Sequence, residues 1–293
     1  MRAQHLARQI RAAIRHLNPQ QVRAAAERPL SVGLAAISAE SLTAMEDFLA
    51  PPTISRQRRW ELMRVLHRMG EPGAPTRFDL EIYEEGLPCP AAGFVFYRQT
   101  PERTVEEILT AREDLGLALA RHFHPFRKPV AQRIIRTISR ENAAFALLTA
   151  VPDIVPSLVQ LPWAVGEFAS DTAFITMNQV RMAFLLAAAS DRTVGYREQR
   201  MEIASIVAGA FGWRALAREL AGKIPFGGGL VPKAAIAYAG TYTVGQGLER
   251  LYRVGYRLTR QERKAVYEQA LEHGRRFVDY LLEGTRIREA TQL

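Results

Sequence analysis

Two histidines separated by one residue, His122 and His124, are the side chains best suited to begin a metal site. Neutral imidazoles bind zinc, but a structural zinc site uses four ligands, and no third ligand lies near this pair in the sequence. We therefore interpret both histidines as residues at the C-terminal end of a helix, and we predict no bound metal.

The single cysteine, Cys89, lies between two prolines in a predicted loop. Neither a neighbouring cation nor a helix start is present to activate its thiol, so we interpret it as an ordinary loop residue. No Ser-His-Asp or Cys-His arrangement can be assigned from the sequence. We predict no catalytic residue and no cofactor.

A glycine run, Gly227–Gly229, precedes Lys233 and invites interpretation as a phosphate cradle. The spacing from the glycines to the lysine differs from that of a phosphate loop, and Pro232 has no backbone N–H to donate. We interpret the run as the turn of a helical hairpin.

Charged side chains are rare in two blocks of the C-terminal half, residues 142–190 and 203–248. The charges of the first block are Asp153, Glu167, Asp171 and Arg181. Ionisable groups inside an apolar block are costly and are usually functional, which makes an ion relay one interpretation. The interpretation that we favour is structural, with Asp171 capping a helix and the other charges near helix ends.

Each charge-poor block is too long for one bilayer crossing, which needs about 20 residues, and fits a hairpin of two apolar helices. Prolines and glycines interrupt the first block between residues 152 and 170 and the second at Pro225–Gly229. Arginine-rich strips flank both blocks, as expected for the cytoplasmic ends of membrane hairpins, at residues 133–140, 192–200 and 250–264.

Two arginines oppose full insertion of these hairpins. Arg181 and Arg214 lie within the blocks, and a charged side chain near the bilayer centre costs about 2.5–3.5 kcal/mol. We expect a location at the cytoplasmic side of a membrane, peripheral or hairpin-inserted, with a purely cytoplasmic location as the alternative.

Small residues recur at the spacing of helix contacts in the same blocks, such as Ser205 with Gly209 and Thr241 with Gly245. Such steps let helices approach closely in lipid and also in soluble bundles. The residues that we expect at helix contacts or interfaces are Gly209, Gly212, Arg214, Gly245, Asp171, Gln179 and Arg181.

Residues 150–250 resemble the YcjF-like, GTPase-associated helical domain of unknown function that follows bacterial GTPases of the Era/YcjF type. The matching features are Val151–Pro156, Asp171, Gln179-x-x-Met182, Val207–Arg214, Ile224–Gly229 and Ala234–Gly247. The resemblance implies a helical, often membrane-linked module without known catalysis. It also implies a GTPase domain or partner. The apolar hairpins would serve to anchor the chain or to oligomerise it, so a homo-oligomer is a further expectation.

The part before this module alternates strand and helix patterns. We expect strands at Leu30–Ile37, Phe78–Tyr83 and Gly93–Tyr97, and helices capped by Ser38 or Ser41, by Ser55 and by Thr100. The second helix is expected over Arg56–Met69, and the third runs from Pro101 and ends at His122–Pro125. This order resembles the first half of a GTPase domain.

The phosphate loop of such a domain is missing. A working loop needs G-x-x-x-x-G-K-[ST], whose amides and lysine neutralise the phosphates. The segment Gly33–Ser41 has no second glycine and no lysine, and Glu40 repels phosphate. We interpret the region as a degenerate G-domain-like module in which nucleotide hydrolysis is not expected.

The predicted fold is mainly α, with a C-terminal bundle of two apolar helical hairpins and a small N-terminal α/β subdomain. We expect a basic amphipathic helix in 1–27, with Leu6, Ile10, Ile14 and Leu17 on its apolar stripe. The expected remainder is an α/β subdomain in 28–125, a YcjF-like domain in 126–283 with helices at Val130–Arg140 and Arg260–Leu282, and a tail in 284–293.

The net charge of +9 comes almost entirely from arginine. Aromatic and basic residues are not interleaved as in nucleic-acid binders, so we expect membrane lipid or a membrane protein as partner, and not nucleic acid. The expected function is a non-catalytic, membrane-associated helical anchoring or scaffold protein. The alternatives are a soluble regulatory nucleotide-binding protein and a soluble scaffold subunit of a larger complex.

Overall fold

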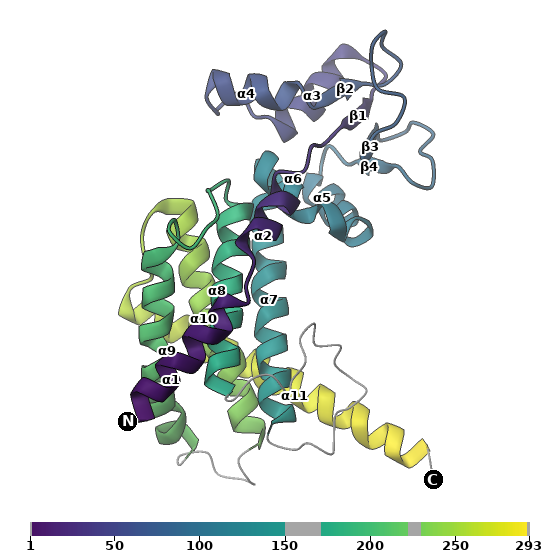
Figure 1. Ribbon diagram of the computed structural model, residues 1–293. Helices are drawn as coiled ribbons and strands as arrows, with labels where there is room; N and C mark the ends of the chain where they lie inside the picture. Colours follow the sequence, from purple (N-terminus) through teal and green to yellow (C-terminus); the bar gives the residue numbers. More distant parts are fainter. Residues whose placement is uncertain (1, 150–170, 222–229, 292–293) are drawn as a thin grey trace. The chain divides into compact units, whose positions relative to one another are not determined.

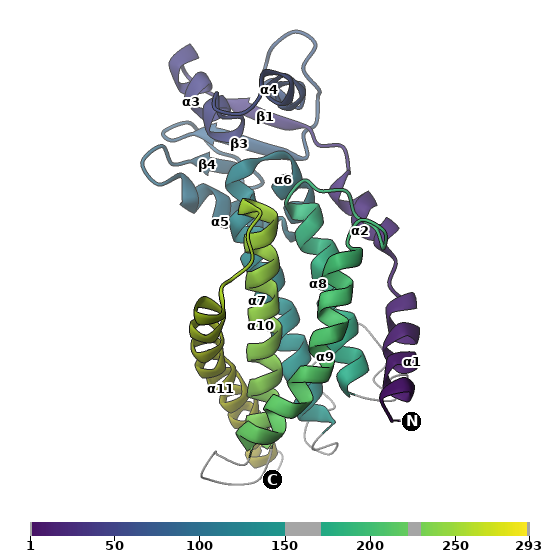
Figure 2. The ribbon, with the colours of Figure 1, turned by 90° about the vertical axis from the view of Figure 1, so that its left-hand side faces the viewer.

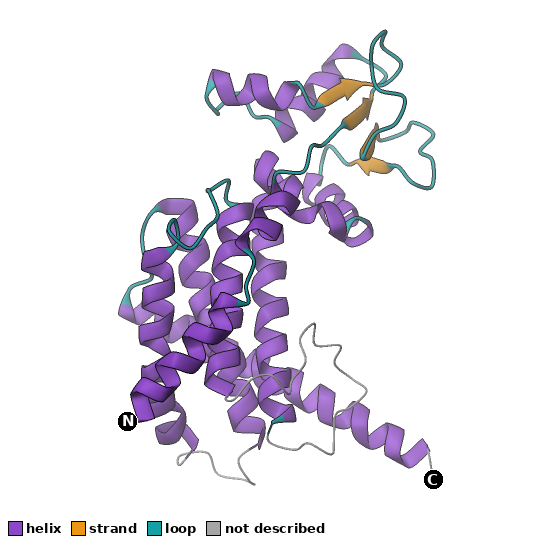
Figure 3. Ribbon diagram, in the orientation of Figure 1, coloured by secondary structure: helices purple, strands orange, loops and turns teal. Residues whose placement is uncertain are grey.

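The structure is a computed structural model that describes residues 2–149, 171–221 and 230–291 (Figure 1). The chain divides into two compact units. The helical unit comprises residues 1–20, 133–187 and 194–293, and the α/β unit comprises residues 21–132 and 188–193. Helices dominate, and a small sheet lies in the α/β unit (Figure 3), which confirms the predicted fold class.

The sheet of the α/β unit has four parallel strands in the order β2-β1-β3-β4. The strands are β1 (Val32–Ala35), β2 (Leu66–Arg68), β3 (Leu80–Glu84) and β4 (Phe94–Phe96). The central strands β1 and β3 bury apolar side chains, because helices cover a parallel sheet on its faces. The strands predicted near residues 30, 78 and 93 are therefore confirmed.

The helices of this unit are α2 (Pro19–Ala26), α3 (Ala39–Leu49), α4 (Arg56–Met63), α5 (Pro101–Ala111), the 3-10 turn η1 (Glu113–Leu115) and α6 (Gly116–His122). Serines cap two of them, whereas Thr100, the predicted N-cap of α5, makes no side-chain capping hydrogen bond. Ser38 Oγ accepts a hydrogen bond from the Ser41 amide at 3.1 Å, and Ser55 Oγ accepts one from the Arg58 amide at 3.2 Å. These two predicted N-caps are confirmed.

The helix predicted over Arg56–Met69 is wrong in its last turn. Helix α4 ends at Met63, and the next residues form β2, which pairs with β1 in the register Val32 to Leu66. A three-residue strand held by a distant partner has no periodicity of its own to reveal it. Trp60 in this helix is 62% exposed.

The long helix predicted from Pro101 to the histidines is also wrong, because it is broken at Arg112. The backbone of Arg112 leaves the helical region, and its guanidinium donates to Asp114 Oδ1 at 3.0 Å and to the Asp79 carbonyl at 2.5 Å. The second of these hydrogen bonds connects Arg112, where the helix is broken, to Asp79, the residue before β3. Helix α6 starts after this break.

The helical unit contains α1 (Arg2–Arg15), α8 (Asp171–Ala189), α9 (Arg200–Ala221), α10 (Leu230–Val254) and α11 (Arg260–Thr291). It also contains most of α7 (His124–Leu148), whose first residues belong to the α/β unit. In Figures 1 and 2, α8, α9, α10 and the later part of α7 run side by side. Helices α7 and α11 extend beyond the predicted Val130–Arg140 and Arg260–Leu282.

The first helix packs on the helical unit as an ordinary amphipathic helix. Ile10 and Leu17 of its predicted stripe are buried, at 1% and 7% exposure. The hydroxyl of Tyr196 donates to the carbonyls of Ile14 and Leu17, each at 2.7 Å. Ile10 and Leu17 are therefore covered by the protein itself.

Candidate functional site

The connections between the strands of the α/β sheet reverse their direction between the two central strands, β1 and β3. The chain leaves β1 toward β2 on one side, and β3 lies on the other side of β1. In open parallel sheets, ligands bind beyond the carboxyl ends of the strands at this switch point. The residues found there are Ile37 to Ser41 after β1 and Glu84 at the end of β3.

Glu84 occupies this position with its own carboxylate. The Ile37 amide donates to Glu84 Oε2 at 2.7 Å, and the Ser41 hydroxyl donates to Glu84 Oε1 at 2.5 Å. These donors lie at the start of α3, where free N–H groups and the helix dipole favour an anion. The carboxylate therefore lies where a phosphate would bind in a nucleotide-binding sheet.

The same contacts lower the pKa of the Glu84 carboxyl. The hydrogen bond from Ser41 is the largest cause, followed by the Ile37 amide, and the nearby charge of Arg98 adds to them. Arg98 in turn pairs with Glu40 at 3.2 Å. Glu84 is therefore a second carboxylate, besides the predicted Glu40, that would repel a phosphate at this position.

Gly33 is the glycine of the segment that stands in place of a phosphate loop, and its role here is in side-chain packing. A Cβ at this position would lie 2.7 Å from Cδ2 of Phe78 and 2.9 Å from two further ring atoms. The space beside Gly33 is therefore filled by an aromatic ring of the same unit. The glycine permits that ring to approach the strand closely.

A pH-dependent contribution to stability follows from the lowered pKa of Glu84. The folded pKa lies below the unfolded one, so the stabilisation is present above the unfolded pKa and is lost as pH falls through the folded pKa. We expect Glu84→Gln to lower the unfolding free energy at neutral pH, and the difference from wild type to shrink on acidification. Denaturant melts at several pH values measure this.

The control for this experiment is Glu85→Gln, which changes the next and exposed carboxyl. That variant is expected to follow the wild-type pH dependence. Equal pH dependence for wild type and Glu84→Gln would show that the carboxylate does not hold the start of α3.

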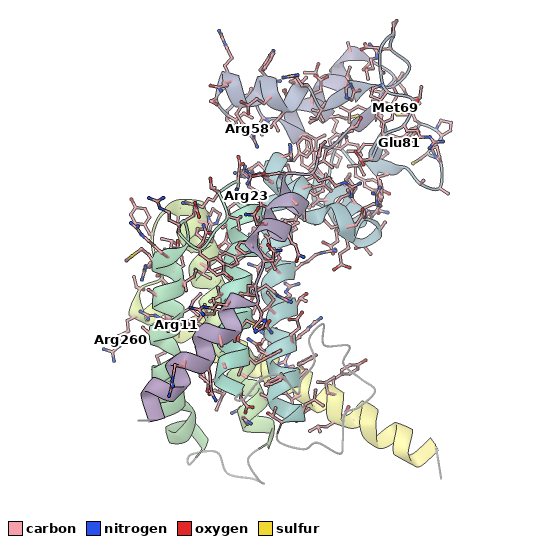
Figure 4. The ribbon with its side chains drawn as sticks, viewed as in Figure 1. Arg11, Arg23, Arg58, Met69, Glu81 and Arg260 are labelled. Carbon is pink, nitrogen blue, oxygen red and sulfur yellow. The ribbon has the colours of Figure 1, made fainter. Side chains whose placement is uncertain are left out.

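The predicted histidine pair lies beside a cluster of arginines in the α/β unit. Asp191, whose φ of 57° lies in the left-handed region, has its carboxylate 3.1 Å from Arg58 (labelled in Figure 4), 3.6 Å from Arg127 and 3.8 Å from Arg121. Its turn is therefore fixed by three guanidinium groups. The cluster ties the segment 188–193 to α4, α6 and the first residues of α7.

His122 ends α6, as the sequence predicted for this histidine. Its Nδ1 lies 2.9 Å from the Ala118 carbonyl, and burial lowers the pKa of the imidazole. His124 is instead the first residue of α7. Within the described ranges, no three His, Cys, Asp or Glu side chains are grouped closely enough to hold a metal ion.

A buried network of amide and hydroxyl groups joins three helices of the helical unit. Asn142 on α7 donates to Thr241 Oγ1 on α10 at 2.8 Å and accepts from Asn178 Nδ2 on α8 at 2.9 Å. Gln179 on α8 donates to Thr241 Oγ1 at 3.3 Å. Asn142, Asn178 and Thr241 are each 0% exposed, so the network fixes the register of the three helices inside an apolar core.

Two predicted interface charges form separate ion pairs. Arg181 donates to both carboxylate oxygens of Glu141, at 2.7 and 2.9 Å, with each side chain 17% exposed. Asp171 pairs with Lys233 at the starts of α8 and α10. Arg181 and Asp171 therefore have different ion-pair partners among the described residues, and the other two charges of this block, Asp153 and Glu167, lie outside them.

Gly245, one of the predicted small residues, lies at a close contact between helices. A Cβ there would lie 2.8 and 2.9 Å from two carbons of Ile135 and 3.0 Å from Met182 Sδ. Gln179 and Met182, which the family resemblance singled out, thus both meet α10. Gly209 borders a shallow cavity near Thr243 and Leu258.

Several predictions fall where the structure gives no description. Gly212 and Arg214 lie in α9, but their surroundings are outside the described side chains. The proposed hairpin turns within 152–170 and at Gly227–Gly229 lie outside the described residues.

The sequence interpretation missed the residues that do most in these arrangements. Glu84, Asn142 and Asn178 were not singled out, whereas Thr241 was expected at a helix contact together with Gly245 but not as a hydrogen-bond partner. The signal for the asparagines was available, since amides are rare in apolar blocks and are paired when buried. The sequence around Glu84 did not indicate its role, because its hydrogen-bond donors, Ile37 and Ser41, belong to the distant connection between β1 and α3.

One helix in the described part of the chain, α8, is long and apolar enough to cross a membrane. The 18-residue window that qualifies has a mean hydropathy of 1.2, and 78% of it is buried inside the protein. Core helices of soluble proteins pass the same test, so composition alone does not assign α8 to a bilayer.

Comparisons with known proteins found no relative of this chain. No family model, no curated protein and no solved structure matches the chain.

Proposed function

We propose that this chain is a non-catalytic, membrane-associated helical anchoring or scaffold protein of the YcjF-like class. Its α/β unit is a docking module descended from a nucleotide-binding domain, and its helical unit is the anchor or assembly module. No cofactor takes part. The partners are membrane lipid or a membrane protein, with a GTPase and a second copy of the chain as further partners.

The observation that carries this proposal is the position of Glu84. A parallel sheet with a switch point is the architecture of many nucleotide-binding domains. Here the start of α3 is neutralised by a carboxylate of the same unit, at 2.7 and 2.5 Å. Binding of a phosphate would require that carboxylate to leave and would place two anions together. This disfavours the alternative of a soluble nucleotide-binding protein.

The helical unit supports an anchoring role through the arrangement of its helix ends. Lys233 pairs with Asp171 and donates to Thr149 Oγ1 at 3.2 Å, so the end of α7 meets the starts of α8 and α10. The arginines of 192–200 lie between or near the end of α8 and the start of α9, and those of 250–264 between or near the end of α10 and the start of α11, as expected for cytoplasmic flanks.

Fractionation of cells that express the full chain tests this function. We expect the chain in the membrane pellet at low salt, with release by detergent. Recovery in the soluble fraction at low salt without detergent contradicts membrane association.

A charge-reversal variant sharpens the fractionation. Arg257 and Arg260 are both exposed; Arg257 lies between α10 and α11, and Arg260, labelled in Figure 4, is the first residue of α11. Each basic residue near an anionic surface contributes about 1 kcal/mol to binding. We expect Arg257→Glu with Arg260→Glu to increase the salt-extractable fraction several-fold. The matched control reverses Arg56 and Arg77, exposed residues of the α/β unit, and is expected to behave as wild type.

The second candidate function is a soluble scaffold subunit, which the burial of α8 favours. Its apolar window is 78% covered by the protein, so lipid is not needed to hide it. This candidate predicts a monodisperse chain in size-exclusion chromatography without detergent, whereas the membrane-associated form predicts aggregation or loss from solution.

A further inference from the structure

A cavity of about 520 Å³ lies on the helical unit between α7, α10 and α11. We call it the arginine–tyrosine groove. Its walls include three cations and three aromatic rings, namely Arg136, Arg140, Arg276, Tyr238, Tyr242 and Phe277. The proposed anchoring role uses none of these side chains.

Each wall of the groove consists of residues one helical turn apart. Arg136 and Arg140 are four residues apart on α7, and Tyr238 and Tyr242 are four apart on α10. Like charges at this spacing repel each other on an isolated helix. An anion bound between Arg136 and Arg140 offsets that repulsion, so the pair is stabilised when an anion occupies the groove.

Ring contacts fix the aromatic floor. Tyr238 is 5% exposed and stacks on Tyr242, with centroids 6.0 Å apart and an interplanar angle of 11°. Phe277 lies 6.2 Å from Tyr238, and the Arg140 guanidinium lies 5.7 Å above the Phe277 ring. Gly274 lets α11 approach, since a Cβ there would lie 3.0 Å from both Tyr238 Cβ and the Ala235 carbonyl.

The charge of the groove is positive and largely uncompensated. No carboxylate of the described residues forms an ion pair with Arg136 or Arg140, and no acidic side chain lines the cavity. Arg276 pairs with Glu272 at 3.3 Å, which leaves it partly neutralised. Burial raises the pKa of Tyr238, whereas the positive charges of Arg140 and Arg136 lower it. The electrostatic field of the two arginines therefore reaches Tyr238 on the aromatic floor of the groove.

We infer that the arginine–tyrosine groove binds a phosphate ester that carries an aromatic or other apolar group. Guanidinium groups donate in a planar fork that matches phosphate oxygens, and two or more of them suit a dianion. The stacked rings offer an apolar face for the rest of the ligand and favour planar groups. Both a small organic phosphate and a phosphorylated lipid headgroup have this chemistry.

Calorimetric titration of the full chain tests the site with phenyl phosphate as the probe. We expect saturable binding of phenyl phosphate that is at least about tenfold tighter than binding of inorganic phosphate, because only the ester uses the rings. Arg136→Gln and Arg140→Gln are each expected to weaken binding of the ester about tenfold or more. Tyr242→Ala is expected to reduce the preference for the ester over inorganic phosphate.

The matched control is Arg275→Gln. Arg275 is exposed and adjacent to Arg276 in sequence, but it does not line the groove. This variant is expected to bind as wild type, although it loses the same charge. Equal weakening by Arg275→Gln and Arg140→Gln would indicate only general attraction by the basic surface and would overturn the assignment.

A second arm distinguishes the two sources of phosphate. Flotation with phosphatidylcholine vesicles, with or without phosphatidic acid, is compared for wild type and Arg140→Gln. Loss of phosphatidic-acid-dependent flotation in the variant assigns the groove to lipid headgroups. Unchanged flotation together with weaker phenyl phosphate binding assigns it to a soluble ester. Absence of saturable binding in both arms contradicts the inference, whatever the fractionation of the wild type shows.

Discussion

Asn142→Ala is expected to lower the unfolding free energy by about 2–4 kcal/mol, the largest effect among the substitutions considered. Asn142 is 0% exposed and bridges Thr241 on α10 and Asn178 on α8. Its removal takes one hydrogen bond from each of these buried partners. Thr241 keeps its bond from Gln179, and the Asn178 amide keeps only a long 3.4 Å contact with Glu141. Losing a buried hydrogen-bond partner costs about 1–3 kcal/mol. The small cavity left by the side chain adds to the loss.

Chemical denaturation followed by circular dichroism measures this effect, with every variant in the same buffer. The matched control is Thr137→Ala on the same helix, which is exposed and expected to change stability by less than about 0.5 kcal/mol. A loss below about 1 kcal/mol for Asn142→Ala would mean that the three helices are not held together by this network.

Gly245→Ala is expected to destabilise the helical unit although alanine is the better helix former. The added Cβ would lie 2.8 Å from Ile135 Cγ1 and 2.9 Å from Ile135 Cγ2. These atoms belong to a stiff β-branched side chain on α7, so α10 and α7 must separate. Overpacking costs about 1–3 kcal/mol, which exceeds the helix-propensity gain of about 1 kcal/mol.

Gly247→Ala provides the comparison two residues further along α10. Its added Cβ would have Leu258 Cδ1 as nearest neighbour, at an ordinary 3.8 Å. We expect this variant to match or exceed wild-type stability by up to about 1 kcal/mol, through helix propensity alone. Thermal melts of both variants decide the point, and similar stabilisation by both would refute the close contact at Gly245.

The sequence predicted the elements that depend on interactions between residues close together in the chain. Ser38 and Ser55 are at the helix starts that their side chains cap, and the apolar runs near residues 30, 78 and 93 form strands. Strand β2 escaped prediction because Leu66 acquires its extended state from pairing with Val32, far away in sequence. The break at Arg112 likewise depends on distant Asp79.

The candidate site was harder to predict, because its parts come from separate connections. Gly33 and Glu40 were correctly noted as parts of a segment without a phosphate loop. Only the parallel register that pairs Ala35 with Tyr83 places Glu84 beside the start of α3. The arginine pair of the groove was visible as a strip on α7, but its aromatic partners on α10 and α11 are set by tertiary packing.

The occupation of the α3 start by Glu84 is tested most directly by titrating the full wild-type chain with GTP and with ATP in the presence of magnesium. We expect no saturable binding of either nucleotide at concentrations up to the millimolar range, because the carboxylate already uses the Ile37 amide and the Ser41 hydroxyl. Saturable micromolar binding that is lost when Ser41 is replaced by alanine would contradict the proposed function.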